Sequence, residues 1–534
     1  MGIVAVLIAV MLFAVGCPAT EPAEEPETPD EVTGRIIWST YAEPAGFNPI
    51  LQGGHNERWT WERVFASLIR IDENLEPEGE IAEDWEISED GLEYTFYLRD
   101  DVFFHDGEQL TAEDVAFTYN AIKDPGYTGY AAGQFESLEY AEVVDEYTVR
   151  LILSEPYSPL MSRLFIGILP KHLYDAEPVA DMMNNPYNRA PIGAGPFKFE
   201  TFDPGQHTIV VANEDYFGEG PYTAEQRQRI VSDQDVAVAA LEAGEIDYLY
   251  VTGTTRARLM EQYADRLDFY DWERLGTDFL QLNHLSFGLD DVRVRQALSH
   301  AINQDAIVDD ILEGMGMNIY GPLPTTSWAY DEQVIQKFPY DPEQAVALLE
   351  EAGFQQNTDG IFEKDGQPLT WRAFTNAGNT RRESVLLLAQ DNLSDIGIEL
   401  QLEFLDWGIM QDEHLWKGDF DMVLQGIGWP PDPDQYDRFH SSQAERDADG
   451  RFRGMNHSSF KNDEIDRLLE RGRTEPDPEI RKQIYSDYQA LWSELQPWIQ
   501  LHGAIGTGAV TNDIGGVVIG EGEGPIKPWL WYRE

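Results

Sequence analysis

The sequence predicts an α/β fold with two or more domains, and three observations support this prediction. Segments with the two-residue alternation of a strand interleave with segments that have the apolar spacing of a helix. The chain has 534 residues and is 42% hydrophobic, so it is too long for a single core. A junction of helix, glycine and strand also occurs twice, at Gly244 and at Gly418. This repeat is either a coincidence, because such junctions are common, or a sign of two related α/β lobes.

The first clear elements are a strand and the helix that follows it. The strand is predicted by alternating apolar residues, namely Leu92, Tyr94, Phe96 and Leu98. After a turn at Asp106 and Gly107, a helix is expected to begin behind Thr111 as its N-cap. Asp114, three residues later, completes the pattern of a capping box.

Similar signals mark the later elements. Asp341 caps a helix that has Pro342 in its first position and ends at Gly353. A second helix, which ends at Gly397, leads into a strand with alternating apolar residues, namely Ile398, Leu400, Leu402 and Phe404. The last long helix is predicted by apolar residues at helical spacing, namely Ile480, Ile484, Tyr488, Leu491, Trp492 and Leu495.

The N-terminus resembles a lipoprotein signal. Residues 3–15 are thirteen consecutive apolar residues, too few to span a bilayer but suited to the core of a signal peptide, although no Lys or Arg precedes Arg35. Small residues then lead to Cys17, the only cysteine, which rules out a disulfide within the chain. We expect a signal peptide at 1–16, a lipid on Cys17 and a flexible tether at 17–33, because the residues after Cys17 are rich in Pro, Glu and Thr.

The net charge of −60 excludes nucleic acid as a partner, because phosphate binding needs a basic surface. The 97 acidic residues are spread along the whole chain, which is the pattern of a solvated surface and not of one cation site. Acid-rich and lysine-poor surfaces resemble those of proteins from salty habitats, where salt screens the repulsion. We therefore interpret the charge as a sign of habitat.

Motifs for catalysis and metal binding are absent from the sequence. There is no GxSxG, P-loop or HExxH motif, and the one cysteine lies in the signal. No two of the ten histidines are two or four residues apart, which argues against a preformed local metal site. We expect no enzyme activity, no cofactor and no metal.

Six fragments in series identify a family resemblance. They are FHDGEQLTAEDVAFTYN, PIGAGPFKFE, NEDYFG, DDVRVRQALSHAINQDAIVDDIL, YDPEQAVALLEEAGF and GDFDMVLQGIGW. On the basis of these fragments, the chain from about residue 34 to residue 534 resembles the extracellular solute-binding proteins of peptide/nickel-type ABC importers, most of all the oligopeptide- and dipeptide-binding group. The resemblance implies a receptor that binds a peptide and delivers it to an ABC permease. Other ligands in this family are oligosaccharides and nickel chelates, and a ligand-sensing lipoprotein is a further alternative.

The resemblance also implies an architecture, namely a two-lobed periplasmic-binding-protein-like fold (type II) with an extra subdomain in the first lobe. Lobe one is expected at 34–282 together with 504–534, and its extra subdomain at about 73–190. Lobe two is expected at 283–503. The ligand is held between the lobes, and the lipid anchor keeps a monomeric receptor in the cell envelope near its membrane partner.

Five ligand-binding residues are expected from the same patterns. Arg382 follows Asn379 as in the family pattern GN-x-x-R, and the resemblance places both in the site. The guanidinium of Arg382 is suited to a ligand carboxylate. The alternatives are that Arg382 faces solvent or pairs with an acid, or that Arg381 takes its role. Trp407, in the fragment LDWGIM, matches the tryptophan of the family pattern.

The loop 428–437, GWPPDPDQYD, is expected to form the centre of the cleft because ligands bind beyond the carboxyl ends of strands. Its prolines restrict the backbone, and Trp429 offers a flat apolar face. The resemblance gives Asp432 the role of pairing with a peptide α-ammonium group. The alternatives are a core tryptophan and a structural aspartate in the DPD sequence.

Overall fold

The computed structural model describes residues 31–522 and 524–534. The predicted signal peptide, Cys17 and most of the tether therefore lie outside the described residues. Within the described ranges, none of the helices is both long and apolar enough to cross a bilayer.

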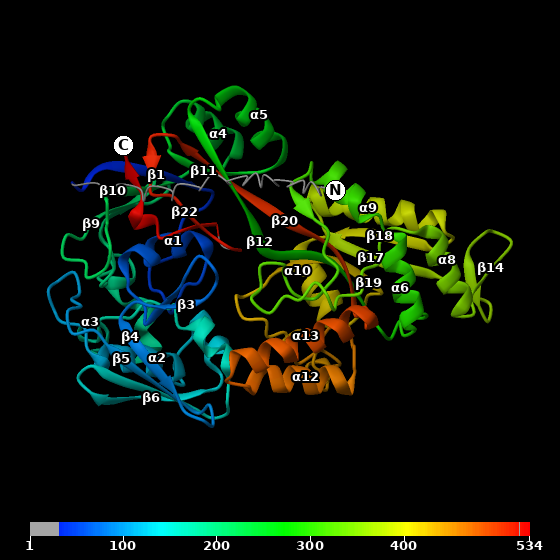
Figure 1. Ribbon diagram of the computed structural model, residues 1–534, viewed down its shortest axis with the longest axis horizontal. Helices are drawn as coiled ribbons and strands as arrows, with labels where there is room; N and C mark the ends of the chain where they lie inside the picture. The colour runs from blue at the N-terminus through cyan, green and yellow to red at the C-terminus, as the bar shows by residue number, and fades with distance from the viewer. Residues whose placement is uncertain (1–30, 523) are drawn as a thin grey trace, which may run out of the picture.

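One long mixed sheet of eleven strands runs through both lobes of the molecule (Figure 1). Its order is β18-β17-β19-β12-β20-β11-β1-β10-β9-β8, with β13 paired to β20. The strands in lobe one are β1 (Thr33–Thr40), β8 (Phe197–Asp203), β9 (His207–Ala212), β10 (Thr223–Ile230) and β11 (Tyr248–Val251). Those in lobe two are β13 (Gly316–Met317), β17 (Thr370–Asn376), β18 (Glu399–Leu405) and β19 (Met422–Gly428). Two long strands join the lobes, namely β12 (Leu267–Leu282) and β20 (Trp498–Thr511).

Lobe one carries a subdomain built on a separate four-stranded sheet. Its strands, in the order β4-β5-β7-β6, are β4 (Ala82–Ile87), β5 (Glu93–Leu98), β7 (Thr148–Leu153) and β6 (Leu138–Asp145). The helix α2 (Ala112–Lys123) packs on this sheet, and one core joins the subdomain to α1 (His55–Val64) and to β8. The predicted capping box is confirmed, because Asp114 accepts from the Thr111 N–H and Thr111 accepts from the Glu113 N–H. The other helices of the main part of lobe one are α4 (Gln234–Glu242) and α5 (Gly253–Tyr263).

Two large hydrophobic cores and one small cluster lie in the described part of lobe two. The first lies between its strands and three helices, which are α6 (Val292–Ala301), α8 (Pro342–Glu351) and α9 (Thr380–Asp395). The second packs the pair α12 (Asp463–Thr474) and α13 (Pro478–Leu495) against the start of β20. The predicted start of α8 is confirmed, since Asp341 accepts a hydrogen bond from the Gln344 N–H and Pro342 is the first helical residue.

The repeated junction marks equivalent places in the two lobes. Gly244 and Gly418 both adopt a positive φ, +72° and +66°, just before β11 and β19. The strand β11 lies between the linking strand β20, to which it is antiparallel, and β1 of its own lobe, to which it is parallel. In the same way, β19 lies between the antiparallel linking strand β12 and the parallel strand β17 of its own lobe. This correspondence favours two related lobes over coincidence. The boundaries at 282 and 503 stay a prediction, because β12 and β20 pass between the lobes without a break.

Candidate functional site

The strand directions place the carboxyl ends of the two lobes opposite each other. The first half of β12 pairs with the end of β20 in lobe one, and its second half pairs with the start of β20 in lobe two. The strand β11 is antiparallel to β20 and therefore runs towards lobe two, together with β1 and β10. The strand β19 is antiparallel to β12 and runs towards lobe one, together with β17 and β18. Because ligands bind beyond the carboxyl ends of such strands, the candidate site is the region between these two edges.

Arg382 lies at the lobe-two edge, at the start of α9. Its Nε and Nη2 donate to the two carboxylate oxygens of Asp278, each over 3.1 Å, and its Nη1 donates to Asn376 Oδ1 over 3.1 Å. Arg381 Nη2 donates to the same carboxylate over 2.9 Å. Asn379 is the N-cap of α9, and its side chain accepts from the Arg382 N–H over 3.2 Å. The pairing of Arg382 with an acid, one of the alternatives, is therefore present in the structure.

This cluster has an excess of positive charge. Burial alone would raise the pKa of Asp278, but its hydrogen bond to Arg382 and the charges of Arg381 and Arg382 outweigh burial and lower it. Burial lowers the pKa of His502, 3.6 Å from Asp278, to about 4, so this imidazole is neutral at pH 7. Two guanidinium groups thus share one carboxylate, and the Arg381 side chain is 37% exposed. The cluster is able to receive a second carboxylate.

The two tryptophans have different environments. Trp407 begins the short helix α10 (Trp407–Ile409) directly after β18, and it is 48% exposed. Trp429 is 7% exposed, belongs to the second core of lobe two, and donates through Nε1 to Thr277 Oγ1 over 3.3 Å. Trp407 therefore offers a free apolar face at the edge of lobe two, whereas Trp429 occupies the position of a core residue.

Asp432 forms a buried ion pair with Arg481 of α13. Arg481 Nη1 and Nη2 donate to the two carboxylate oxygens, both over 2.9 Å, and the two side chains are 7% and 6% exposed. Arg481 Nε also donates to the Gly472 carbonyl over 2.8 Å. This arrangement is the one expected of a structural aspartate, and pairing of Asp432 with a ligand ammonium group stays a prediction.

Three residues of the arginine cluster were not predicted from the sequence, namely Asp278, Asn376 and His502. The one available signal was Asp278 itself, an acid directly before the mostly apolar segment FLQL at residues 279–282. Arg481 was also missed, since an arginine in the first turns of an amphipathic helix is usually exposed.

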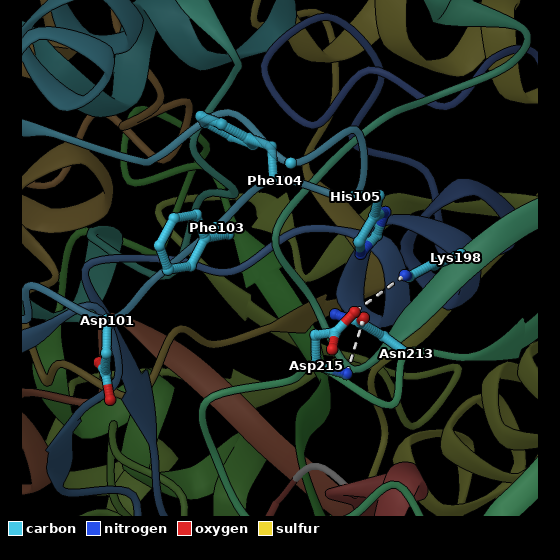
Figure 2. A pocket seen from close by; sticks show the side chains of 8 residues that line it. Asp101, Phe103, Phe104, His105, Lys198, Asn213 and Asp215 are labelled. Atoms are coloured by element: carbon cyan, nitrogen blue, oxygen red, sulfur yellow. Dashed lines mark hydrogen bonds and ion pairs between the residues drawn. The ribbon is translucent and has the colours of Figure 1, made fainter.

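A separate hollow of about 420 Å³ lies wholly within lobe one, between the subdomain and the main sheet (Figure 2). The polar side chains that line it already have partners. Lys198 Nζ is 3.7 Å from Asp215 Oδ2, and Asn213 Oδ1 accepts from the Asp215 N–H. His105 bonds to the Gly195 carbonyl. This hollow does not adjoin the facing strand ends, so we do not assign it as the candidate site. Among the residues that the structure describes, no cluster of three His, Cys, Asp or Glu side chains is arranged to hold a metal ion.

Comparisons with known proteins agree with the two-lobed geometry. Residues 76–446 match the family model of bacterial extracellular solute-binding proteins, family 5. The oligopeptide-binding protein AppA of Bacillus subtilis is 31% identical, over 93% of this chain and 92% of the relative. The dipeptide-binding protein of Escherichia coli is 28% identical, over 86% of this chain and 88% of the relative.

Solved structures give the same result. The structure of Bacillus subtilis AppA in complex with a nonapeptide has a TM-score of 0.75 at 30% identity, covering 94% of this chain and 99% of that one. The structure of NikZ from Campylobacter jejuni in complex with Ni(L-His) has a TM-score of 0.76 at 28% identity, covering 93% and 99%. The resemblance of the six fragments and the α/β class are thereby confirmed, and the relatives are binding proteins of ABC transporters and not enzymes. The chain belongs to the bacterial extracellular solute-binding proteins of family 5.

Proposed function

We propose that the protein captures peptides between its two lobes outside the cell and delivers them to an ABC permease. The observation that carries this proposal is the pair of facing carboxyl edges, one of which holds the arginine cluster around Asp278. The similarity to AppA, whose structure contains a nonapeptide, supports the peptide as the ligand.

In this proposal the arginine cluster recognises an acidic group of the ligand. A ligand carboxylate pairs with Arg381 and Arg382, which share the carboxylate of Asp278 in the structure. Asn379 holds the start of α9 and so orients Arg382. Trp407 packs against an apolar ligand side chain through its exposed face.

The loop 428–437 contributes shape in the proposed site. The ion pair of Asp432 with Arg481 and the core packing of Trp429 hold this loop in one conformation. A preorganised loop loses less conformational entropy when a ligand binds. Ligand contacts from both lobes then stabilise the closed conformation, which is the one the permease recognises.

The anchor belongs to the same proposal. A lipid on Cys17 and the tether behind it keep the receptor at the outer face of a membrane, within reach of its permease. One acyl chain binds a membrane only weakly, so retention needs the several chains of a mature lipoprotein. We propose further that the acid-rich surface reflects a salty habitat.

A nickel chelate is the second candidate ligand, because the NikZ structure with Ni(L-His) is about as similar as that of AppA. The carboxylates of a chelating ligand would pair with the same two arginines. Thermal unfolding separates the candidates, since a ligand at 100 times its Kd stabilises the folded state by about 2.7 kcal/mol. We expect a mixture of peptides to raise the unfolding temperature and Ni(L-His) to leave it unchanged. The reverse result would make the protein a nickel receptor, and no shift with either would contradict both assignments.

A further inference from the structure

The lobes touch at a second place, remote from the linking strands β12 and β20. On the side of lobe one this contact consists of Tyr157 and Ser158, at the start of the short helix η2 (Ser158–Arg163). On the side of lobe two it consists of the end of α12, with Arg473 and Glu475. The Ser158 hydroxyl donates to the Glu475 carbonyl. Figure 1 shows α12 reaching across to the subdomain of lobe one, below the strands that link the lobes.

Arg473 connects an aromatic ring of each lobe. Its guanidinium carbon lies 4.9 Å from the ring centre of Tyr157 in lobe one and 4.5 Å from that of Tyr436 in lobe two. Its Nε is 3.7 Å from Asp434 Oδ2, and the Asp434 side chain is only 8% exposed. A partly desolvated guanidinium between two ring faces gains more from this contact than it does in open water.

Each half of the contact is held in place by residues of its own lobe. In lobe two, the Asp434 N–H donates to Asp432 Oδ1, which is fixed in turn by the ion pair with Arg481. In lobe one, the Tyr94 hydroxyl donates to the Tyr157 carbonyl over 3.3 Å, and Tyr157 is part of the subdomain core. Little side-chain ordering remains to be done when the two surfaces come together.

We propose that Tyr157, Ser158, Arg473 and Glu475 form a latch that holds the two lobes closed. The proposal also gives the loop 428–437 a role in lobe closure, because Asp434 and Tyr436 of this loop contact Arg473. The latch depends on the proposed function in one respect, namely that closure of the lobes traps a ligand. The latch makes contacts in the closed state that an open state lacks, so it shifts the equilibrium towards closure and slows ligand release.

The test is single-molecule energy transfer on ligand-free protein. Dyes are attached to Glu139→Cys on the subdomain and Glu479→Cys on α13, two exposed positions in different lobes, with Cys17→Ala removing the only native thiol. We expect Arg473→Met to lower the ratio of closed to open molecules about tenfold, because the ring contacts to both lobes are lost together with the charge. The matched control is Arg471→Met, an exposed arginine of the same helix, which we expect to behave like the unmodified protein.

Tyr157 provides a second, graded test. Tyr157→Phe keeps the ring face and should preserve the closed fraction, whereas Tyr157→Leu removes the ring and should lower it. Ser158 lies at the half-buried start of η2, so Ser158→Ala tests the latch even if the other variants fail to fold. This variant should lower the closed fraction about threefold, because the hydrogen bond to Glu475 is lost. An unchanged closed fraction in Arg473→Met and Ser158→Ala would overturn the latch. Peptide binding retained in those variants would leave the proposed function intact, so the two failures are distinguishable.

Discussion

Replacing Asp432 by Asn distinguishes a structural aspartate from a ligand-binding one. The change keeps the shape of the side chain but leaves the Arg481 guanidinium buried without its counter-charge. Burial alone would lower the pKa of Arg481, yet its pKa is raised above the ordinary value because Asp432 lies so close. Both side chains are less than a tenth exposed, so solvent screens the pair weakly. Removing one partner of such a pair costs about 3–5 kcal/mol.

The expected cost converts into a measurable change in melting temperature. Unfolding entropy for the roughly 220 residues of lobe two is about 0.5 kcal/mol/K, so a loss of 4 kcal/mol lowers its midpoint by about 8 °C. Differential scanning calorimetry at pH 7 measures this change. The double variant Asp432→Asn with Arg481→Met removes both charges and should recover part of the loss, which completes a double-mutant cycle.

The opposite result would show that Asp432 recognises the ligand. In that case the melting temperature of Asp432→Asn lies within about 1–2 °C of that of the unmodified protein, which is the size of change expected of a neutral surface substitution. The variant then loses peptide affinity, and N-acetylation of the peptide costs the unmodified protein much and the variant little. Equal effects of N-acetylation on both proteins would remove amine recognition from Asp432.

Three further predictions concern other parts of the chain. Arg382→Ala should weaken peptide binding at least tenfold, since it removes one of the two guanidiniums on Asp278, and an affinity within twofold by calorimetric titration would contradict this role. Burial favours the protonated carboxyl of Asp434 and raises its pKa to about 6. The contribution of Asp434 to the stability of the folded protein is therefore fully present below about pH 4 and is lost as the pH rises through 6. Asp434→Asn should therefore stabilise the protein at pH 8 by up to about 3 kcal/mol in urea unfolding, with the difference vanishing near pH 4, and a variant less stable at pH 8 would refute this. Cys17→Ala should release the protein from the membrane fraction with binding intact, and a variant that stays with the membranes would exclude Cys17 as the anchor.

Local features of the fold could be predicted from the sequence, because they depend on residues that are neighbours in the chain. Thr111 and Asp114 are three residues apart, and Asp341 caps the helix that it directly precedes. The glycine junctions at 244 and 418 require a positive φ, and each closes a helix before a strand. Such signals are independent of tertiary packing, and the structure confirms them.

The chemistry of the site depended on contacts between distant residues. Asp278 is 104 residues from Arg382, and Asp432 is 49 residues from Arg481. A sequence motif identifies Arg382 and Asp432 and gives their approximate place in the fold. The oppositely charged residue that each of them pairs with depends on how the strands and helices pack. Of two carboxylates in the sequence DPD, only packing determines that the first pairs with Arg481 and the second lies beside Arg473.

Mass spectrometry of the ligand released from purified protein tests the central claim most directly. The protein is isolated without refolding, its unfolding in acid releases any bound molecule, and the released fraction is analysed for peptides, sugars and metal chelates. Our account predicts a set of intact peptides at up to one molecule per protein, enriched over a parallel sample of a control protein. Recovery of an oligosaccharide or a nickel chelate in place of peptides, in amounts matching the protein, would contradict it.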